Sequence, residues 1–346
     1  MNVIILAAGK SSRFPNMRPK YLLTCYDHKL MIEHAIECFD ELDNITIVIL
    51  KEHCEQYQAD VFLREALGDK IHIVILDHIT NGPAETAMLA IKEQNITGSI
   101  FIKDCDTFLQ FTPESGNRIA VANLKDYPTI KNVGGKSFVK SNEQGIIQSI
   151  VEKQVVSNIF SVGGYQFNSA TMFVDQAAKL INTSNQEVYI SHVIDSLIAD
   201  GEVFSTLPVA SFVDVGTAND WLAWNRQRPV LFIDIDGVLV RNQSRYGSNK
   251  FGTPVDILEK NVAVLLTQQA AGAQFIFTTG RQSSFDDITH QLLQSLGFKN
   301  YQLLSGLYTT NRILVNDFDY SNPYPSATAI NVVRNGDDLE KYFKGL

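Results

Sequence analysis

The sequence is poor in cysteine, contains no cluster of basic residues and has no long apolar segment. Its four cysteines lie far apart and without C-x-x-C spacing, at positions 25, 38, 54 and 105. This pattern indicates neither a disulfide framework nor a zinc knuckle. No stretch approaches the ~20 apolar residues that a membrane-spanning helix needs. The short apolar start at residues 3–8 has no basic leader, so it predicts a buried first strand and not a signal peptide.

Acidic residues outnumber basic residues by 38 to 29, which gives a formal net charge of −9. Without a run of Lys or Arg, neither nucleic acid nor an anionic membrane is an expected partner. The negative balance does not exclude small phosphorylated substrates, because a few local Arg, Lys and backbone N–H groups, with a divalent metal, can bind them. We therefore expect a cytoplasmic protein that acts on small molecules.

The length predicts two domains. At 346 residues the chain exceeds the size at which a single hydrophobic core usually stops growing. Its 45% hydrophobic and 19% charged residues are typical of a globular protein. A polar stretch at 225–229 interrupts the pattern, and a new aliphatic run begins directly after it. We place the domains at residues 1–225 and 229–346.

Both predicted domains have an α/β pattern, with a mostly parallel sheet flanked by helices. In the first, aliphatic runs at 3–6, 45–50, 71–76 and 99–102 alternate with segments of helical period, one around 32–39 and one beginning at Pro83. Beyond residue 110, glycine pairs predict hairpins and a substrate-facing region. In the second, strands are predicted at 230–233, 274–277, 313–315 and 329–333, with a helix near 284–296.

A glycine-containing loop follows the first strand, and its letters at 6–14 are LAAGKSSRF. Backbone N–H groups in such a turn can face a polyphosphate, and Arg13 and Lys20 would neutralise its charge. Alone, such a turn is as often purely structural. With Pro19-Lys20 behind it, the loop resembles the signature of the sugar-phosphate nucleotidyltransferase family, whose members join an NTP to a phosphorylated sugar or alcohol and release pyrophosphate. The resemblance covers about the first 225 residues and implies a Rossmann-like, GT-A-like fold.

Later motifs occur in the order that this family shows. Residues 80–86 resemble its base-contacting loop, 149–153 its E-K pair, 162–167 its G-x-Y strand and 212–217 its D-x-G-T segment. The resemblance implies that the glutamate of the E-K pair binds substrate hydroxyls and that its lysine binds the substrate phosphate. The residues assigned in this way to nucleotide and substrate binding are Leu6, Ala7, Ala8, Gly9, Gly82, Pro83, Ala84, Asp104, Glu152, Lys153 and Gly164.

Carboxylates end an aliphatic strand at Asp104 and Asp106, where open α/β sheets bind their ligands. Two aspartates there can instead cap a turn. Hard oxygen ligands suit Mg²⁺, and the resemblance implies that Asp106 and Asp214 hold the metal. A phosphate oxygen attacking the α-phosphorus of an NTP needs charge neutralised on both sides of the phosphorus, so cations matter more than an acid or a base. Arg13, Lys20 and Lys153 are the predicted catalytic cations.

The second domain has two carboxylates at i and i+2, Asp234 and Asp236, at the end of an aliphatic strand. With Thr279 before Gly-Arg and Asp317 further on, the segment resembles the haloacid dehalogenase-like phosphatase superfamily and its Rossmannoid fold. The resemblance implies that Asp234 is the nucleophile, that Asp236 is the acid/base, and that Thr279 binds phosphoryl oxygens. A second Mg²⁺ would then be held by Asp234, Asp236 and Asp317. Arg312 stands where this superfamily usually has a lysine, which puts hydrolysis in doubt.

Only about forty residues separate the two aspartates from Thr279, which leaves room for a minimal cap. Open sites of this kind accept bulky substrates or are covered by a neighbouring domain or subunit, so a homo-oligomer is one hypothesis. The leading prediction is a bifunctional enzyme of surface-polysaccharide precursor synthesis, a transferase that uses an NTP and a phosphorylated small molecule, fused to a phosphatase. CTP is the favoured nucleotide, although base selection depends on backbone groups that the letters do not show.

Three alternatives remain open from the sequence. The first keeps the transferase and makes the C-terminal domain a non-catalytic regulatory or assembly module. The second is a nucleotide-binding sensor. The third is a glycosyltransferase with a D-x-D metal site on a similar sheet, but this reading leaves the 6–14 loop with Arg13 and Lys20 unexplained.

Overall fold

The computed structural model describes residues 1–39, 44–127, 130, 133–184, 186–226, 228–242, 256–316 and 327–343. Within it the chain forms two compact units, Met1–Trp221 and Leu222–Leu346. Helix α7 (Ala218–Arg226) begins in the first unit and ends in the second, and Trp221 is buried. No helix among the described residues has the length and apolar character required to traverse a membrane.

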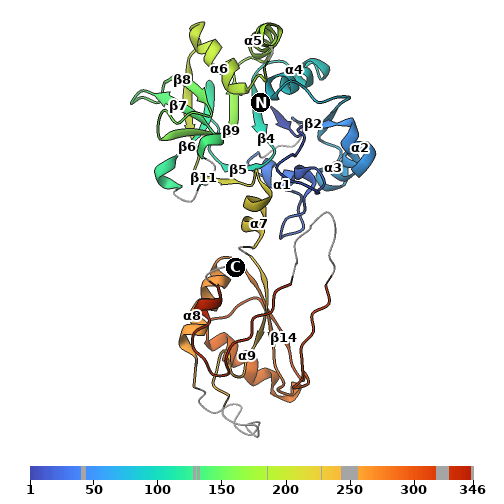
Figure 1. Ribbon diagram of the computed structural model, residues 1–346, viewed down its shortest axis with the longest axis vertical. Coiled ribbons are helices and arrows are strands. Elements are labelled where there is room, and N and C mark those ends of the chain that lie inside the picture. Colours follow the sequence, from blue (N-terminus) through green and yellow to red (C-terminus); the bar gives the residue numbers. More distant parts are fainter. Residues whose placement is uncertain are drawn as a thin grey trace. The chain divides into compact units, whose positions relative to one another are not determined.

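The first half of unit 1 is the parallel part of its main sheet (Figure 1). Strands β1 (Asn2–Leu6), β2 (Ile45–Leu50), β3 (His72–Leu76) and β4 (Ile100–Asp104) lie in the order β4-β1-β2-β3 and are all parallel. Every residue of β2 is buried, as an aliphatic strand covered on both faces requires. These strands confirm the four predicted from the sequence.

Helices cover both faces of this sheet. Helices α1 (Met31–Ile36), α2 (Lys51–Tyr57) and α3 (Ala59–Leu67) share one hydrophobic cluster with it. Helices α4 (Pro83–Glu93), α5 (Ala170–Thr183) and α6 (Ile190–Ala199) share the other. Proline begins α4 as predicted, and it follows Gly82, whose φ of 133° few other residues adopt. The Ser169 hydroxyl caps α5 by accepting from Met172 N at 3.2 Å.

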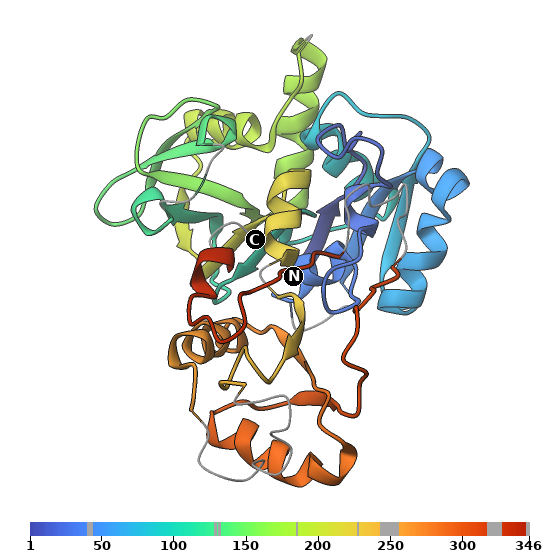
Figure 2. The ribbon, with the colours of Figure 1, turned by 60° about the horizontal axis from the view of Figure 1, so that its bottom comes forward.

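The second half of unit 1 turns the sheet antiparallel. Strand β9 (Ile159–Phe167) runs antiparallel to β4 and to β6 (Asn117–Asn123), and β10 (Phe204–Pro208) extends the sheet beyond β6. Strands β7 (Ser137–Ser141) and β8 (Ile147–Glu152) form the predicted hairpin, and β5 (Thr107–Gln110) pairs with β11 (Ser211–Asp214). Figure 2 shows β6–β9 in green on one side of unit 1 and β1–β3 in blue on the other. The predicted α/β fold with a parallel-rich sheet is confirmed for this unit.

Unit 2 has a small parallel sheet, β12-β13-β14, made of Val230–Asp234, Gln274–Thr278 and Tyr301–Leu304. Helices α8 (Glu259–Ala270), α9 (Asp286–Ser295) and the short α10 (Glu340–Phe343) accompany it. Its core gathers aliphatic and aromatic side chains, among them Ile235, Leu265, Phe277 and Leu293.

The strands predicted at 313–315 and 329–333 are wrong. The structure assigns neither segment to a helix or a strand, and Val315 and Val333 are 94% and 71% exposed. An apolar triplet has the composition of a strand, but β-propensity depends on a neighbouring strand and a buried face. Most of the polar loop at 241–250 and the predicted ligand Asp317 lie outside the described residues.

Candidate functional site

Two proposed metal carboxylates of unit 1 face the same small space. Asp106 follows β4, whose neighbour β1 ends in register with it, with Leu6 opposite Asp104. Asp214 ends β11, opposite Thr107. A Cβ atom at Gly216 would lie 2.9 Å from Asp106 Oδ2 and 2.9 Å from Asp214 Oδ1. Only a residue without a side chain leaves this space open between the two carboxylates.

Backbone hydrogen bonds join three distant segments around this space. Val215 N donates to Asp106 O at 3.0 Å, and Ala218 N donates to Arg13 O at 3.2 Å. Lys20 N donates to Ser11 Oγ at 3.2 Å. The glycine loop, the turn after β4 and the start of α7 are therefore held together at the carboxyl end of the parallel strands, where α/β sheets bind ligands.

Cations from the glycine loop and from the segment that follows it lie against Asp106. Lys20 Nζ donates to Asp106 Oδ2 at 2.7 Å, and Arg13 Nη2 is 3.6 Å from the same oxygen. Burial opposes ionisation of Asp106, but the adjacent ammonium outweighs burial and holds the pKa of Asp106 below its usual range. Burial likewise opposes the charge on Lys20, and the Asp106 carboxylate raises the pKa of Lys20 above normal.

Asp104 has the opposite environment. Burial and then the charge of Asp106 raise the pKa of Asp104. Gly163 lies directly against it, because a Cβ atom there would be 2.4 Å from Asp104 Oδ2, and its φ is 80°. The predicted substrate residue Gly164 is close to Phe101 and Ala120, with a Cβ position 2.9 Å and 3.0 Å from their side chains. Tight packing of β9 explains both glycines.

A stability measurement checks the raised pKa of Asp104. When the pKa of an aspartate is higher in the folded than in the unfolded state, its protonated form stabilises the folded protein. This stabilisation is complete below the ordinary aspartate pKa of about 4, and it is lost as the pH rises through the folded-state pKa. Asp104→Asn does not titrate, so its melting temperature relative to wild type should be higher at pH 8 than at pH 4.5. We expect a difference of about 3 °C, since 1 kcal/mol shifts Tm by roughly 2–4 °C in domains of this size. The measurement is thermal unfolding in chelator.

Asp175→Asn, which removes an exposed carboxylate from α5, is the control for that experiment. A relative Tm of Asp104→Asn that stays constant between the two pH values would show that Asp104 is not disfavoured in its charged form.

The other predicted nucleotide residues lie on the ends of β1 and α4. Ala7 and Ala8 are buried and Gly9 is exposed, and Ala7 N already donates to Val48 O at 2.9 Å in the sheet. Gly82 is in close contact with Val188, and Ala84 N donates to Val188 O at 3.2 Å. The loop before α4 is therefore held against the segment that precedes α6.

The E-K pair lies at the end of the β7–β8 hairpin. Glu152 Oε2 accepts from Ser137 Oγ at 2.5 Å and from Ser191 Oγ at 2.7 Å. Lys153 Nζ donates to Tyr189 OH at 2.6 Å, and this hydrogen bond raises the pKa of Lys153. Both side chains therefore meet the start of α6, where Glu152 is half-buried and Lys153 is exposed.

From the sequence alone, no role was assigned to three cationic residues that lie near the sites. Lys136 Nζ donates to Asp214, and no motif marks this lysine. Lys103 is fully buried and donates to Asp104 O at 3.0 Å, and its unusual position in an aliphatic strand was the available signal. Burial lowers the pKa of Lys103. Arg281 belongs to the Thr-Thr-Gly-Arg motif but had no assigned function.

In unit 2, Arg281 holds the predicted acid/base. Its Nη2 donates to Asp236 Oδ1 at 2.7 Å and its Nε to Asp236 Oδ2 at 2.9 Å, a bidentate pair in which the arginine is 4% exposed. Thr279 Oγ1 lies 3.3 Å from Asp236 Oδ2 and is buried. The structure thus brings Thr279 and Asp236 together, and it engages both oxygens of Asp236 with Arg281.

The predicted nucleophile Asp234 ends β12, in register with Thr278 of β13. Burial raises the pKa of Asp234, and Arg312, whose Nη2 is 3.2 Å from Asp234 Oδ1, partly opposes this effect. Both side chains are partly exposed, at 36% and 48%. Arg312 therefore lies where a cation can contact Asp234.

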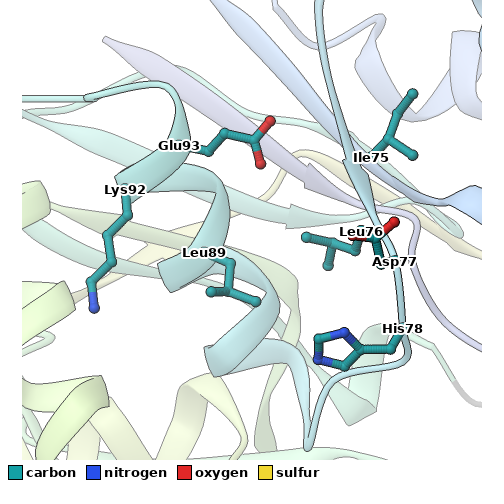
Figure 3. A pocket seen from close by; sticks show the side chains of 7 residues that line it. All are labelled: Ile75, Leu76, Asp77, His78, Leu89, Lys92 and Glu93. Atoms are coloured by element: carbon teal, nitrogen blue, oxygen red, sulfur yellow. The ribbon is translucent and has the colours of Figure 1, made fainter.

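A separate hollow of about 440 Å³ lies between β3 and α4, lined by residues 75–78 and by Leu89, Lys92 and Glu93 (Figure 3). Figure 3 shows His78 at the end of the strand segment facing the helix. It contains none of the predicted site residues. The site of unit 1 is instead defined by the converging carboxylates and cations.

A model of the nucleotidyl transferase family matches residues 2–229. The chain belongs to this family. It is 24% identical over 256 residues to the bifunctional protein GlmU of Latilactobacillus sakei, covering 70% of this chain and 54% of that protein. It is 27% identical over 304 residues to GlmU of Streptococcus gordonii, covering 80% and 63%. The chain thus spans about half to two thirds of the length of these curated relatives.

A solved structure of the same architecture supports the fold of unit 1. The nucleoside-diphosphate-sugar pyrophosphorylase of Vibrio cholerae RC9 superposes with a TM-score of 0.56 at 23% identity and covers 65% of this chain and 100% of its own. The nucleotidyltransferase-like fold expected from the sequence is confirmed by this likeness and by the family match. The family model ends where unit 2 begins its first strand.

Proposed function

We propose that unit 1 transfers a nucleotidyl group from an NTP to a phosphorylated sugar, polyol or similar alcohol and releases pyrophosphate. The observation that carries this proposal is the space at Gly216, bounded by oxygens of Asp106 and Asp214 and by Arg13. Carboxylates and cations around one point suit a reaction at phosphorus, in which charge must be neutralised on both the attacking and the leaving side. Membership of the nucleotidyl transferase family supports the same reaction.

Asp106 and Asp214 fit a Mg²⁺ ion. Among the described residues no three His, Cys, Asp or Glu side chains form a metal cage. Mg²⁺ rarely uses such a cage, because it is commonly held by one or two carboxylates together with substrate phosphates and water. When bound, the ion would supply a Lewis acid that neutralises charge on the phosphates.

The residues of this chain have separate tasks in the proposed reaction. An oxygen of the acceptor phosphate forms a bond to the α-phosphorus, and the bond from that phosphorus to the pyrophosphate oxygen breaks. Arg13, on the glycine loop, and Lys20, which follows the loop, would bind the transferring and leaving phosphates. Lys153 would position the acceptor phosphate and Glu152 its hydroxyls, while Asp104 and the loop of Gly82 and Pro83 would contact the nucleotide.

The test is a matrix of the four NTPs against phosphorylated sugars, polyols and choline, scored for pyrophosphate. CTP is our predicted nucleotide, and this matrix tests whether CTP supports more pyrophosphate release than the other three NTPs. Release of a nucleoside diphosphate from a nucleotide sugar, in place of pyrophosphate from an NTP, would favour the glycosyltransferase alternative. No turnover together with tight nucleotide binding would favour the sensor.

Gly216→Ala tests the space between the carboxylates. The added methyl would lie 2.9 Å from both oxygens and 3.4 Å from Arg13 Nη1, and it would exclude a bound ion without removing any ligand. We expect a loss of kcat of roughly a hundredfold, which corresponds to about 3 kcal/mol. Tm should fall only modestly, because the methyl group displaces the ends of two side chains and not the backbone. Pyrophosphate release and thermal unfolding measure the two effects.

Gly134→Ala is the matched control, because a Cβ atom there meets nothing within 4 Å. Near-normal turnover by Gly216→Ala would place the reacting phosphates elsewhere.

For unit 2 we propose phosphomonoester hydrolysis through an aspartyl phosphate on Asp234, in a domain at 229–346 with a haloacid dehalogenase-like fold. The parallel β12-β13-β14 sheet and the position of Asp234 at its carboxyl edge support this proposal. Asp236 would act as the acid/base, and Thr279 and Arg312 would contact phosphoryl oxygens. A second Mg²⁺ would be held by Asp234, Asp236 and Asp317, and Asp236 would share its carboxylate with Arg281.

One observation favours a non-catalytic unit 2 as the second candidate. The bidentate contact of Asp236 with a buried arginine leaves the predicted acid/base engaged in an ion pair. A regulatory or assembly module would need no mobile carboxylate, and it would accommodate a homo-oligomer as well. Phosphate release from small phosphorylated metabolites distinguishes the two candidates. Under either candidate, we propose that residues 1–225 form the transferase domain.

A further inference from the structure

Lys136 is an additional cation in the site of unit 1. It precedes β7, and its Nζ donates to Asp214 Oδ2 and lies 5.4 Å from the centre of the Phe212 ring. The lysine side chain is 16% exposed and that of Asp214 is 25% exposed. Both groups are thus largely removed from bulk water. An ammonium in such a position needs an anionic partner, and here the partner is one of the two proposed metal carboxylates.

The pair mirrors the one on the other side of the space at Gly216. Lys20, which follows the glycine loop, contacts Asp106 at 2.7 Å, and Lys136 contacts Asp214 from the β7 side. Each proposed metal carboxylate is therefore paired with a lysine. The two lysines come from opposite parts of unit 1, since Lys20 belongs to the loop after β1 and Lys136 to the hairpin that carries the E-K pair.

The backbone joins Lys136 to the acceptor side. Lys153 N donates to Lys136 O at 3.0 Å, and Lys153 has a φ of 55°, a conformation that this contact holds in place. The next residue, Ser137, is in register with Glu152 and donates to it. Lys136 is therefore part of the same hairpin end as the two residues proposed to bind the acceptor.

We propose that Lys136 binds the phosphate of the acceptor, and that it moves to this phosphate when a divalent cation binds Asp214. This inference rests on the proposed function of unit 1. Lys136 contacts Oδ2 of Asp214 and the space at Gly216 faces Oδ1, so the cation and the ammonium share one carboxylate. The charge of a bound cation would therefore weaken the hold of Asp214 on the ammonium. The acceptor phosphate, which Lys153 on the same hairpin end would place, then offers an anion that restores the pairing.

The competition has a measurable consequence without turnover. In the full chain, Mn²⁺ stands in for Mg²⁺ and is titrated by electron paramagnetic resonance in the absence of nucleotide. Lys136→Met removes the competing ammonium, so Mn²⁺ should bind roughly three- to tenfold more tightly than to wild type. Lys136→Arg keeps the charge and should bind Mn²⁺ much as wild type does.

The phosphate contact is measured on the same samples. Inorganic phosphate serves as the probe of the acceptor subsite, and bound Mn²⁺ accelerates the ³¹P relaxation of phosphate held near it. Lys136→Met should bind phosphate at least about fivefold more weakly, which one lost charged hydrogen bond of about 1 kcal/mol or more explains. Lys140→Met, which removes an exposed lysine from β7, is the matched control and should match wild type.

Tighter Mn²⁺ binding together with weaker phosphate binding supports the proposal. Weaker or unchanged Mn²⁺ binding in Lys136→Met, or unchanged phosphate binding, overturns it, and a lower Tm with weaker binding of both would show that the ion pair only holds β7 against β11. Lys136→Gln replaces the methionine variant if that variant does not fold. Since neither readout needs catalysis, a failure of the NTP matrix on wild type would remove the proposed reaction without deciding the result for Lys136.

Discussion

Asp106→Asn is expected to lower pyrophosphate release by about a thousandfold. The variant loses a proposed metal ligand, and a bound metal ion contributes several kcal/mol by stabilising the charge of the transition state. Asparagine keeps the size of the side chain but has no charge to offer a cation or Lys20, whose Nζ lies 2.7 Å from the carboxylate. The measurement is kcat at saturating NTP and Mg²⁺ with the acceptor that the matrix identifies. Mn²⁺ affinity should fall in parallel.

Asp69→Asn, at a side chain that is 96% exposed, controls for the loss of a carboxylate far from any proposed role. The circular dichroism spectrum and Tm establish that the Asp106 variant is folded. Retention of more than a tenth of wild-type turnover by folded Asp106→Asn would refute the assignment of Asp106 to the metal.

Asp234→Asn is expected to abolish phosphate release, with a loss of at least about a thousandfold, because an amide cannot form the aspartyl phosphate. Pyrophosphate release by unit 1 should be unchanged in the same sample. The reciprocal result is expected for Asp106→Asn, which should lose pyrophosphate release and keep phosphate release. A panel of phosphorylated sugars and polyols, assayed for free phosphate, provides the measurement.

Asp287→Asn, at an exposed position of α9, is the control within unit 2. Equal phosphate release by wild type and Asp234→Asn would assign the activity to a contaminant, and its absence from wild type would favour the non-catalytic module. In that case Arg281→Met should still destabilise unit 2, since it would leave Asp236 without its partner.

The sequence predicted the parallel half of unit 1 closely, because each strand there is an aliphatic run covered on both faces. Strand β2 was placed at its observed bounds, Ile45–Leu50. Composition failed at Ile313, which is 81% exposed, since apolar letters alone do not show whether a neighbouring strand is present. Whether an apolar segment is buried depends on the fold, so its letters alone do not decide whether it forms a strand.

The candidate site likewise contains residues that the sequence can predict and residues that it cannot. Aspartates at strand ends, such as Asp106, can be found from sequence because the strand and its carboxyl edge can be found. Lys136 cannot, because it stands alone in a glycine-rich segment and is 78 residues away from Asp214 in the chain. Only the pairing of β5 with β11, and the hairpin beside them, brings it to the carboxylates.

The sharing of helix α7 between the two units limits how the protein can be divided. Trp221, a buried side chain of unit 1, lies one residue before the start of unit 2. A fragment that ends before this tryptophan would lack a buried side chain of unit 1. A fragment that begins after Arg226 would lack the part of α7 that belongs to unit 2. We therefore expect that separate expression of the two units needs two overlapping fragments that both include the helix.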